Sequence, residues 1–178
     1  KGRTTLLNAA REPEVQDLGH CLQAMGAQIE GIGTDTITID GVEALHGAVH
    51  SVLPDRIETG TFAAAAAITG GDVELLGADL THIGSFVDVM KAAGISMEPT
   101  DAGIRVVAIN GRVAGVDAMT EPYPGFPTDL QAQFMALMTV ADGAAMVTET
   151  IFENRFMHVP ELARMGANIT LHGGSALV

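Results

Sequence analysis

The chain has 178 residues, of which 47% are hydrophobic, and a formal charge of −13 from 9 basic and 22 acidic residues. This length fits one large domain or two small ones, and the apolar content is enough to bury a sizeable core. Because the sequence has no basic cluster, its composition argues against binding to nucleic acids and to anionic membranes.

The single cysteine, Cys21, rules out an internal disulfide and fits a reducing, cytoplasmic setting. No Cys or His spacing is typical of zinc, and His158 with Glu161 is a lone i, i+3 pair, so we expect no metal and no cofactor. No apolar run approaches transmembrane length, and no signal peptide is visible. The chain starts without Met and ends on apolar residues, so we expect both ends to lie inside a longer polypeptide.

Three segments share one pattern, an amphipathic helix that ends at a glycine and is followed by a strand. They are residues 17–29, 86–97 and 159–169, with the glycines Gly26, Gly94 and Gly166. After the first two segments, a turn leads into an alternating strand, at residues 36–39 and 104–107.

A second set of helices repeats in the same register. The apolar residues 62–68 precede Gly71, and the apolar residues 134–140 precede Gly143, which lies 72 residues further on. The capping glycines are spaced by 68 and then 72 residues. The sequence therefore predicts an α/β fold built from α+β repeats of about 70 residues, each a helix-strand-helix-strand-strand unit.

Four runs carry a family likeness. They are Asn-Ala-Ala-Arg-Glu-Pro-Glu at 8–14, Pro-Asp-Arg-Ile-Glu-Thr-Gly-Thr at 54–61, Phe-Pro-Thr-Asp-Leu-Gln-Ala-Gln-Phe at 126–134 and Phe-Glu-Asn-Arg-Phe-Met-His-Val-Pro-Glu at 152–161. Together they resemble the enolpyruvyl transferases, and within that family the members that act on UDP-N-acetylglucosamine. The likeness covers essentially the whole chain, which is less than half of a typical member.

The resemblance implies an inside-out α/β barrel, of which about two and a half repeat units are present. It also implies that residues 1–50 end the domain that carries the UDP-sugar site and a mobile loop. Residues 51–178 would then begin the second domain, with a hinge crossing near residues 46–54. Both domains would be incomplete.

The implied partners are UDP-N-acetylglucosamine and phosphoenolpyruvate, with the enolpyruvyl group passing to the sugar 3-hydroxyl. The family's lysine–asparagine pair, loop cysteine, uridine-binding arginines and C-terminal arginines have no counterpart here. We therefore expect these 178 residues alone to be inactive. We also expect that they can self-associate through uncovered apolar faces.

Asp129 and Thr128 sit where a helix is about to begin at Leu130. From the residues alone, either is a helix cap or a first-turn acid. The resemblance implies that Asp129 contacts the acceptor hydroxyl, where a carboxylate can serve as general base, and that Thr128 lines the same site. Both descriptions can hold together.

Arg155 is flanked by apolar Phe152, Phe156 and Met157, which argues against a freely solvated turn. A guanidinium suits carboxylate and phosphate geometry, and the resemblance implies that Arg155 organises the catalytic aspartate and the phosphoenolpyruvate end. It also implies that Ile151 lies beside the sugar, through its backbone.

The positions of three further acidic residues allow two interpretations. Asp55 precedes the small-residue helix at 61–68, and Glu12 and Glu14 flank Pro13, so all three fit ordinary helix starts. The resemblance instead places them at the interdomain cleft. There Asp55 would pair with a cationic residue, and Glu12 and Glu14 would support basic side chains.

Three rival interpretations stay open. The sister enzymes that transfer enolpyruvyl to shikimate 3-phosphate share the repeats and the chemistry, although the runs at 126–134 and 152–161 favour the UDP-sugar enzymes. The chain could instead be a non-catalytic, self-associating piece. It could also be a sugar-binding α/β module unrelated to the family.

Overall fold

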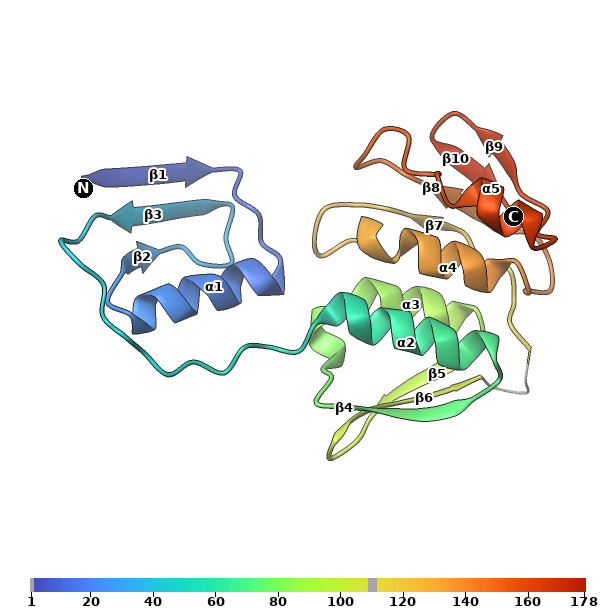
Figure 1. Ribbon diagram of the computed structural model, residues 1–178, viewed down its shortest axis with the longest axis horizontal. Coiled ribbons are helices and arrows are strands. Elements are labelled where there is room, and N and C mark those ends of the chain that lie inside the picture. The colour runs from blue at the N-terminus through green and yellow to red at the C-terminus, as the bar shows by residue number, and fades with distance from the viewer. Residues whose placement is uncertain (1, 109–111) are drawn as a thin grey trace. The chain divides into compact units, whose positions relative to one another are not determined.

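The computed structural model describes residues 2–108 and 112–178 (Figure 1). The chain divides into two compact units, Lys1–Leu53 and Pro54–Val178. Their assignment to the two domains of the family stays a prediction. Among the described residues, no helix is both long and apolar enough to cross a membrane.

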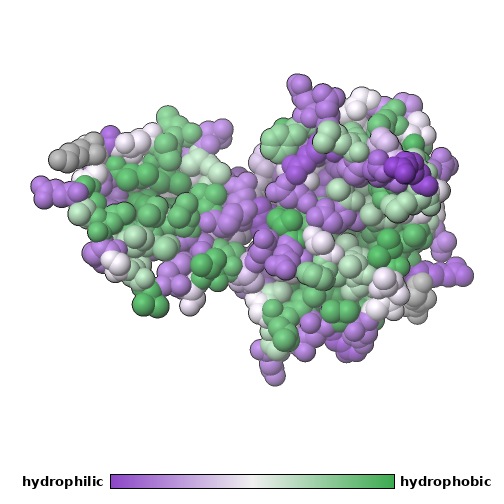
Figure 2. All heavy atoms as spheres, viewed as in Figure 1, coloured by the Kyte–Doolittle hydropathy of each residue, from purple (hydrophilic) through white to green (hydrophobic). Residues whose placement is uncertain are grey.

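The first unit is a three-stranded sheet with one helix. Its elements are β1 (Arg3–Leu7), α1 (Pro13–Ala24), β2 (Gln28–Glu30) and β3 (Thr36–Asp40). The strands pair antiparallel in the order β1-β3-β2. Pro13 occupies the first turn of α1 and Glu14 follows it, as expected for a helix start. Figure 2 shows hydrophobic residues gathered on the visible face of this unit. Leu6, Leu7 and Leu18 of the unit are exposed.

The second unit holds the remaining elements. In chain order they are α2 (Arg56–Ile68), β4 (Asp72–Leu76), η1 (Leu80–His82), α3 (Gly84–Ala92), β5 (Ile95–Pro99), β6 (Gly103–Ala108), β7 (Ala118–Met119), η3 (Thr128–Leu130), α4 (Gln131–Met138), β8 (Met146–Thr148), α5 (Val159–Arg164), β9 (Thr170–His172) and β10 (Ser175–Leu177).

Strand order confirms the predicted repeat. The three antiparallel sets run β1-β3-β2, β4-β6-β5 and β8-β10-β9, so in each set the strand that comes last in sequence lies in the middle. The helices α2 and α4 each precede such a set, which gives the expected helix-strand-helix-strand-strand unit twice. Some boundaries differ. Helix α2 begins at Arg56, before the expected residues 61–68. The strand expected directly after Gly166 begins only at Thr170, where pairing with β10 starts.

Glycine ends the equivalent helix of each repeat for a backbone reason. Gly26, Gly94 and Gly166 have φ values of 98°, 86° and 103°, in the left-handed region that side chains disfavour. Each N–H bonds back to a carbonyl of the last turn, from Gln23, Lys91 and Ala163 respectively. These caps confirm the three predicted helix ends.

The second unit places helices inside and sheets outside. In Figure 1, α2, α3 and α4 lie between the β4-β6-β5 sheet and the sheet that contains β7 and β8. One apolar cluster joins these layers, and it includes Phe86, Phe126 and Phe134. The ring centroid of Phe126 lies 5.9 Å from that of Phe86 and 5.5 Å from that of Phe134. The α/β repeat fold is thus confirmed, and the sheets of the described residues do not close into a barrel.

Gly60 allows α2 to approach the turn that carries the predicted site. A Cβ built on Gly60 would lie 2.4 and 2.8 Å from the two Cδ atoms of Leu130, the last residue of η3. Leu130 is fully buried, so its side chain has little room to move away. Nearby, Gln133 of α4 donates a hydrogen bond to the Thr61 hydroxyl of α2 at 3.0 Å. The position of η3 therefore depends on close helix packing.

Replacing Gly60 with alanine should destabilise the protein although alanine is the better helix former. Overpacking costs about 1–3 kcal/mol, whereas the gain in helix propensity is about 1 kcal/mol. Thermal unfolding should show a lower Tm for Gly60→Ala. Gly84→Ala is the matched control, because a Cβ there meets no atom within 4 Å. A Tm for Gly60→Ala at or above that of Gly84→Ala would contradict this packing constraint.

Candidate functional site

The short parallel pair β7 and β8 brings distant parts of the chain together. Ala118 and Met119 align with Val147 and Thr148, so the next residue, Thr120, lies beside Glu149. The Thr120 N–H donates to the Thr148 carbonyl at 2.9 Å, and the Thr150 N–H donates to the Thr120 hydroxyl at 2.9 Å. Glu149 lies between Thr148 at the end of β8 and Thr150 in the following loop, and its side chain points into the protein interior.

Glu149 accepts hydrogen bonds from five groups. Its Oε1 accepts from the Thr120 hydroxyl at 2.9 Å and from two backbone N–H groups, Ile151 at 2.9 Å and Phe152 at 3.1 Å. Its Oε2 accepts from the Thr128 hydroxyl at 2.8 Å and from the Gln131 amide at 3.2 Å. Only 7% of Glu149 is exposed. One buried carboxylate thus joins the residue after β7, the η3 turn, α4 and the loop after β8.

These hydrogen bonds decide the charge state of Glu149. Burial alone would raise the pKa of its carboxyl group, because it disfavours the charged form. The donors Thr128, Ile151, Phe152 and Thr120 together outweigh burial and hold the pKa below its usual range. Glu149 is therefore ionised at neutral pH and accepts all of these bonds as a carboxylate.

Asp129 and Arg155 form an ion pair at the exposed edge of this network. The Arg155 Nη2 donates to the Asp129 Oδ1 at 2.6 Å, and the Arg155 Nη1 donates to the Thr128 hydroxyl at 3.1 Å. The Asp129 side chain is 53% exposed and that of Arg155 is 38% exposed. The Gln131 amide also reaches the Arg155 carbonyl at 3.4 Å. The pair is accessible, Thr128 beside it is half-buried, and Glu149 and Gln131 behind it are buried.

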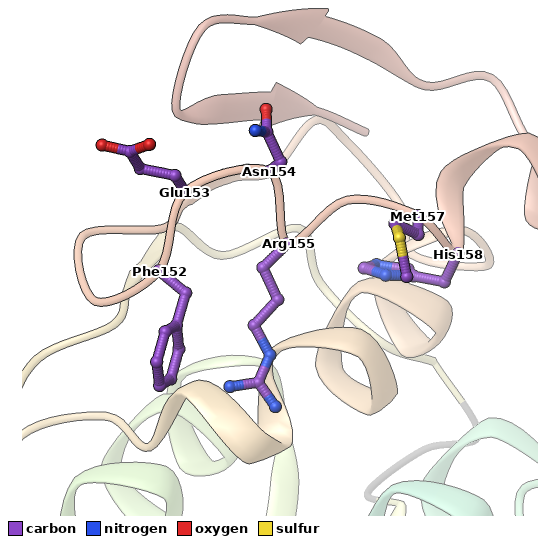
Figure 3. A pocket seen from close by; sticks show the side chains of 6 residues that line it. All are labelled: Phe152, Glu153, Asn154, Arg155, Met157 and His158. Carbon is purple, nitrogen blue, oxygen red and sulfur yellow. The ribbon is translucent and has the colours of Figure 1, made fainter.

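The loop after β8 forms one wall of an open hollow of about 700 Å³, lined by Phe152, Glu153, Asn154, Arg155, Met157 and His158 (Figure 3). Phe152 and Arg155 extend to one side of the loop, whereas Glu153 and Asn154 point to the other. The Arg155 guanidinium lies 5.1 Å from the Phe152 ring centroid, within cation–π range. Asn154 has a φ of 57°, a conformation that asparagine tolerates better than most residues.

His158 adds a neutral group to the same hollow. Burial, and then the positive charge of Arg155, lower the pKa of its imidazole. Its Nε2 lies 3.2 Å from the sulfur of Met135 on α4. The hollow is therefore lined by one cation, Arg155, and one carboxylate, Glu153, with the apolar Phe152 and Met157. Arg155 also bonds to Asp129 beside the hollow.

The structure brings four of the predicted site residues together: Thr128, Asp129, Ile151 and Arg155. Asp55 caps α2, where its Oδ1 accepts from the N–H groups of Ile57 at 2.7 Å and Glu58 at 3.1 Å. Glu12 and Glu14 lie at the start of α1 in the first unit. The roles of these three acids in a site stay predictions.

Sequence reasoning missed Glu149, Thr120 and Gln131, which are all buried. A weak signal exists for Glu149, because this acid lies two residues after the apolar run at 145–147 and shortly before the Glu-Asn-Arg turn. Thr120 and Gln131 carry no such signal in the sequence, since their partner Glu149 is about 20 to 30 residues away. Among the described residues, no three His, Cys, Asp or Glu side chains gather to hold a metal ion.

Comparison with known proteins gives a consistent match. A family model described as EPSP synthase (3-phosphoshikimate 1-carboxyvinyltransferase) matches residues 1–176. Proteins named UDP-N-acetylglucosamine 1-carboxyvinyltransferase are 68% identical in Rhodospirillum centenum (strain ATCC 51521 / SW) and 64% identical in Granulibacter bethesdensis (strain ATCC BAA-1260 / CGDNIH1). These matches cover 100% and 99% of this chain, but the chain spans only 41% and 42% of those relatives.

Solved structures agree on the fold. The enolpyruvyl transferase NikO from Streptomyces tendae has a TM-score of 0.80 and 25% identity, over 99% of this chain and 42% of that one. EPSP synthase from Acinetobacter baumannii has a TM-score of 0.50 and 16% identity, over 100% of this chain and 41% of that one. The second match concerns the fold alone.

Glu149→Gln should destabilise the protein at neutral pH, because an amide nitrogen would face groups that donate. We expect a loss of about 2–4 kcal/mol in the free energy of unfolding, measured by urea denaturation at pH 7. Since the folded pKa of Glu149 lies below its unfolded value, its stabilisation is present above about pH 4.3 and is lost as the pH falls below that.

The difference between wild type and Glu149→Gln should therefore shrink towards pH 3. Glu153→Gln serves as the control, because this exposed glutamate lies in the same loop. It should leave the free energy of unfolding within about 0.5 kcal/mol of wild type. Equal stability of wild type and Glu149→Gln at pH 7 would contradict an ionised, five-bonded carboxylate.

Proposed function

Because this chain belongs to the EPSP synthase family, we propose that the whole protein transfers the enolpyruvyl group of phosphoenolpyruvate to the 3-hydroxyl of UDP-N-acetylglucosamine. The observation that carries the proposal is the 68% identity, over the entire chain, to a protein named UDP-N-acetylglucosamine 1-carboxyvinyltransferase. That name gives both the acceptor and the group transferred. The chain supplies about two fifths of such a protein, so the activity is proposed for the whole protein.

The reaction is an addition followed by an elimination. The sugar 3-hydroxyl oxygen bonds to C2 of phosphoenolpyruvate while C3 gains a proton, which gives a tetrahedral phospho-ketal. Loss of phosphate and of one C3 proton restores the double bond and leaves enolpyruvyl-UDP-N-acetylglucosamine. The hydroxyl must give up its proton as its oxygen attacks, so a carboxylate in reach can act as general base.

In this proposal Asp129 takes that proton. Its side chain is 53% exposed beside the hollow, so a substrate hydroxyl can reach the carboxylate. Arg155 orients Asp129 through the 2.6 Å bond and presents its guanidinium towards the phosphoenolpyruvate end. Developing negative charge there would be stabilised by this cation and by others elsewhere in the protein.

Thr128 and Ile151 complete the acceptor side. The Thr128 hydroxyl is next to both Glu149 and Arg155, and the N–H of Ile151 is already bonded to Glu149. The Ile151 carbonyl is therefore the backbone group we assign to the sugar. Asp55, Glu12 and Glu14 are proposed as partners for cationic groups near the cleft between the domains.

The wider role follows from the reaction. The proposed product is the first committed intermediate of peptidoglycan synthesis, which links the protein to cell wall formation, cell shape and cell division in the cytoplasm. The proposed partners are the two substrates, with neither nucleic acid nor membrane. Self-association is proposed only for the isolated 178 residues, through exposed apolar side chains such as Leu6 and Leu7.

Transfer to shikimate 3-phosphate is the alternative within the family, since the matching family model bears that enzyme's description. The relatives at 60–68% identity are all named for the UDP-sugar reaction. The EPSP synthase structure from Acinetobacter baumannii is only 16% identical. We therefore favour the UDP-sugar acceptor.

Asp129→Asn in the full-length protein tests the proposal. The change removes the base but keeps the size of the side chain, so phosphate release should fall by about 10²–10⁴-fold. Binding of UDP-N-acetylglucosamine, measured by calorimetry, should be retained. Asp88→Asn, at an exposed position on α3, is the control and should release phosphate at the wild-type rate.

Two outcomes would count against the proposal. Unchanged phosphate release by Asp129→Asn would reduce Asp129 to a residue of the first helical turn. Release by the wild type with shikimate 3-phosphate, but not with UDP-N-acetylglucosamine, would move the acceptor to the sister reaction.

A further inference from the structure

The Thr128 hydroxyl stands between a buried anion and an exposed cation. It donates to the Glu149 Oε2 at 2.8 Å and accepts from the Arg155 Nη1 at 3.1 Å. A hydroxyl has one proton to donate, and an ionised carboxylate can only accept. The proton of Thr128 therefore points to Glu149, which leaves its lone pairs facing Arg155.

Arg155 is held on three sides as a consequence. Its Nη1 bonds to Thr128, its Nη2 bonds to Asp129, and its guanidinium lies against the ring of Phe152. The loop that carries Arg155 is fixed as well, because the N–H groups of Ile151 and Phe152 donate to the Glu149 Oε1. Glu149 thus supports Arg155 in two ways: it bonds to Thr128, which contacts the guanidinium, and it bonds to the loop that carries the Arg155 backbone.

The anchor of this network lies out of reach of a substrate. Glu149, Thr120 and Gln131 are buried, whereas Asp129 is exposed. Glu149 therefore does not contact substrate, and any effect on the reaction has to pass through the groups that it holds. Hydrogen-bond chains of this kind fix a reactive group more tightly than its own rotamers would.

We propose that Glu149 is a positioning residue for the transfer reaction and that it sets the Asp129–Arg155 pair through the Thr128 hydroxyl. This inference rests on the proposed function, because the reaction is its readout. It differs from a purely structural role, in which Glu149 would only hold the loop after β8. In that case, loss of the Thr128 hydroxyl would not affect turnover through Arg155.

The test is a double-variant cycle in the full-length protein, with kcat and KM measured for both substrates. Thr128→Val removes the hydroxyl at nearly constant size and leaves Glu149 four donors, so the fold is retained. We expect kcat to fall up to about 100-fold, as misplacement of a reacting group does. KM for UDP-N-acetylglucosamine should change less than about 3-fold. Thr128→Ser keeps the hydroxyl and should restore most of kcat.

In an Arg155→Gln background, Thr128→Val should lower kcat less than about 3-fold further, because the two residues act through one route. Thr148→Val is the matched control, since that hydroxyl bonds to Ser175 on β10 at 3.0 Å and should leave kcat unchanged. Thr128→Ala, with the same expected loss, replaces Thr128→Val if valine prevents folding.

A full loss from Thr128→Val in both backgrounds, or no loss in either, would overturn the positioning role. A KM rise without a fall in kcat would also overturn it. Failure of the wild type to release phosphate from the two substrates would instead overturn the proposed function, and the two failures are therefore distinct.

Discussion

The buried carboxylate of Glu149 is the constraint on which the candidate site depends. An ionised group at this depth is stable only if hydrogen bonds replace the water it has lost, and five donors do so here. Those donors come from four parts of the chain, and satisfying one charge therefore fixes them relative to each other. Asp129 and Arg155 are exposed, yet both are next to a residue that this charge holds. The site thus has a rigid internal support and an accessible reactive edge.

The fold supplies the donors through its repeats. Each repeat ends a helix at a left-handed glycine and returns a strand to the middle of its sheet, which places the strand ends at defined positions. The parallel pair β7 and β8 adds Thr120 to one side of Glu149, and close packing of α2 at Gly60 sets η3 on the other. Helices inside and sheets outside leave the loops at the strand ends free to carry polar groups. Proteins commonly carry function on such loops because a rigid scaffold positions them.

Much of this arrangement could be predicted from the sequence, because the signals are local. Capping glycines and apolar spacing act within one helix or turn, and they predict the repeats. Asp129 and Arg155 are predicted as site residues by the family resemblance of the runs at 126–134 and 152–161, not by these local signals. Glu149 could not be predicted in the same way, since its role depends on side chains about 20 to 30 residues away. The two-residue strand β7 is likewise too short for any periodic signal. Asp55 shows the same limit. Its role as a helix cap can be predicted from the neighbouring residues, whereas a contact in a cleft cannot, because it would depend on groups that are distant in sequence.

The most direct test of the account is a crystal structure of the full-length protein with UDP-N-acetylglucosamine bound. The account predicts that the sugar 3-hydroxyl lies about 2.6–3.2 Å from an oxygen of the Asp129 carboxylate, the distance that proton abstraction requires. It also predicts that Arg155 still bonds to Thr128 and Asp129 in that complex. A sugar nucleotide whose 3-hydroxyl lies away from Asp129, or an Arg155 turned away from Thr128, would contradict it.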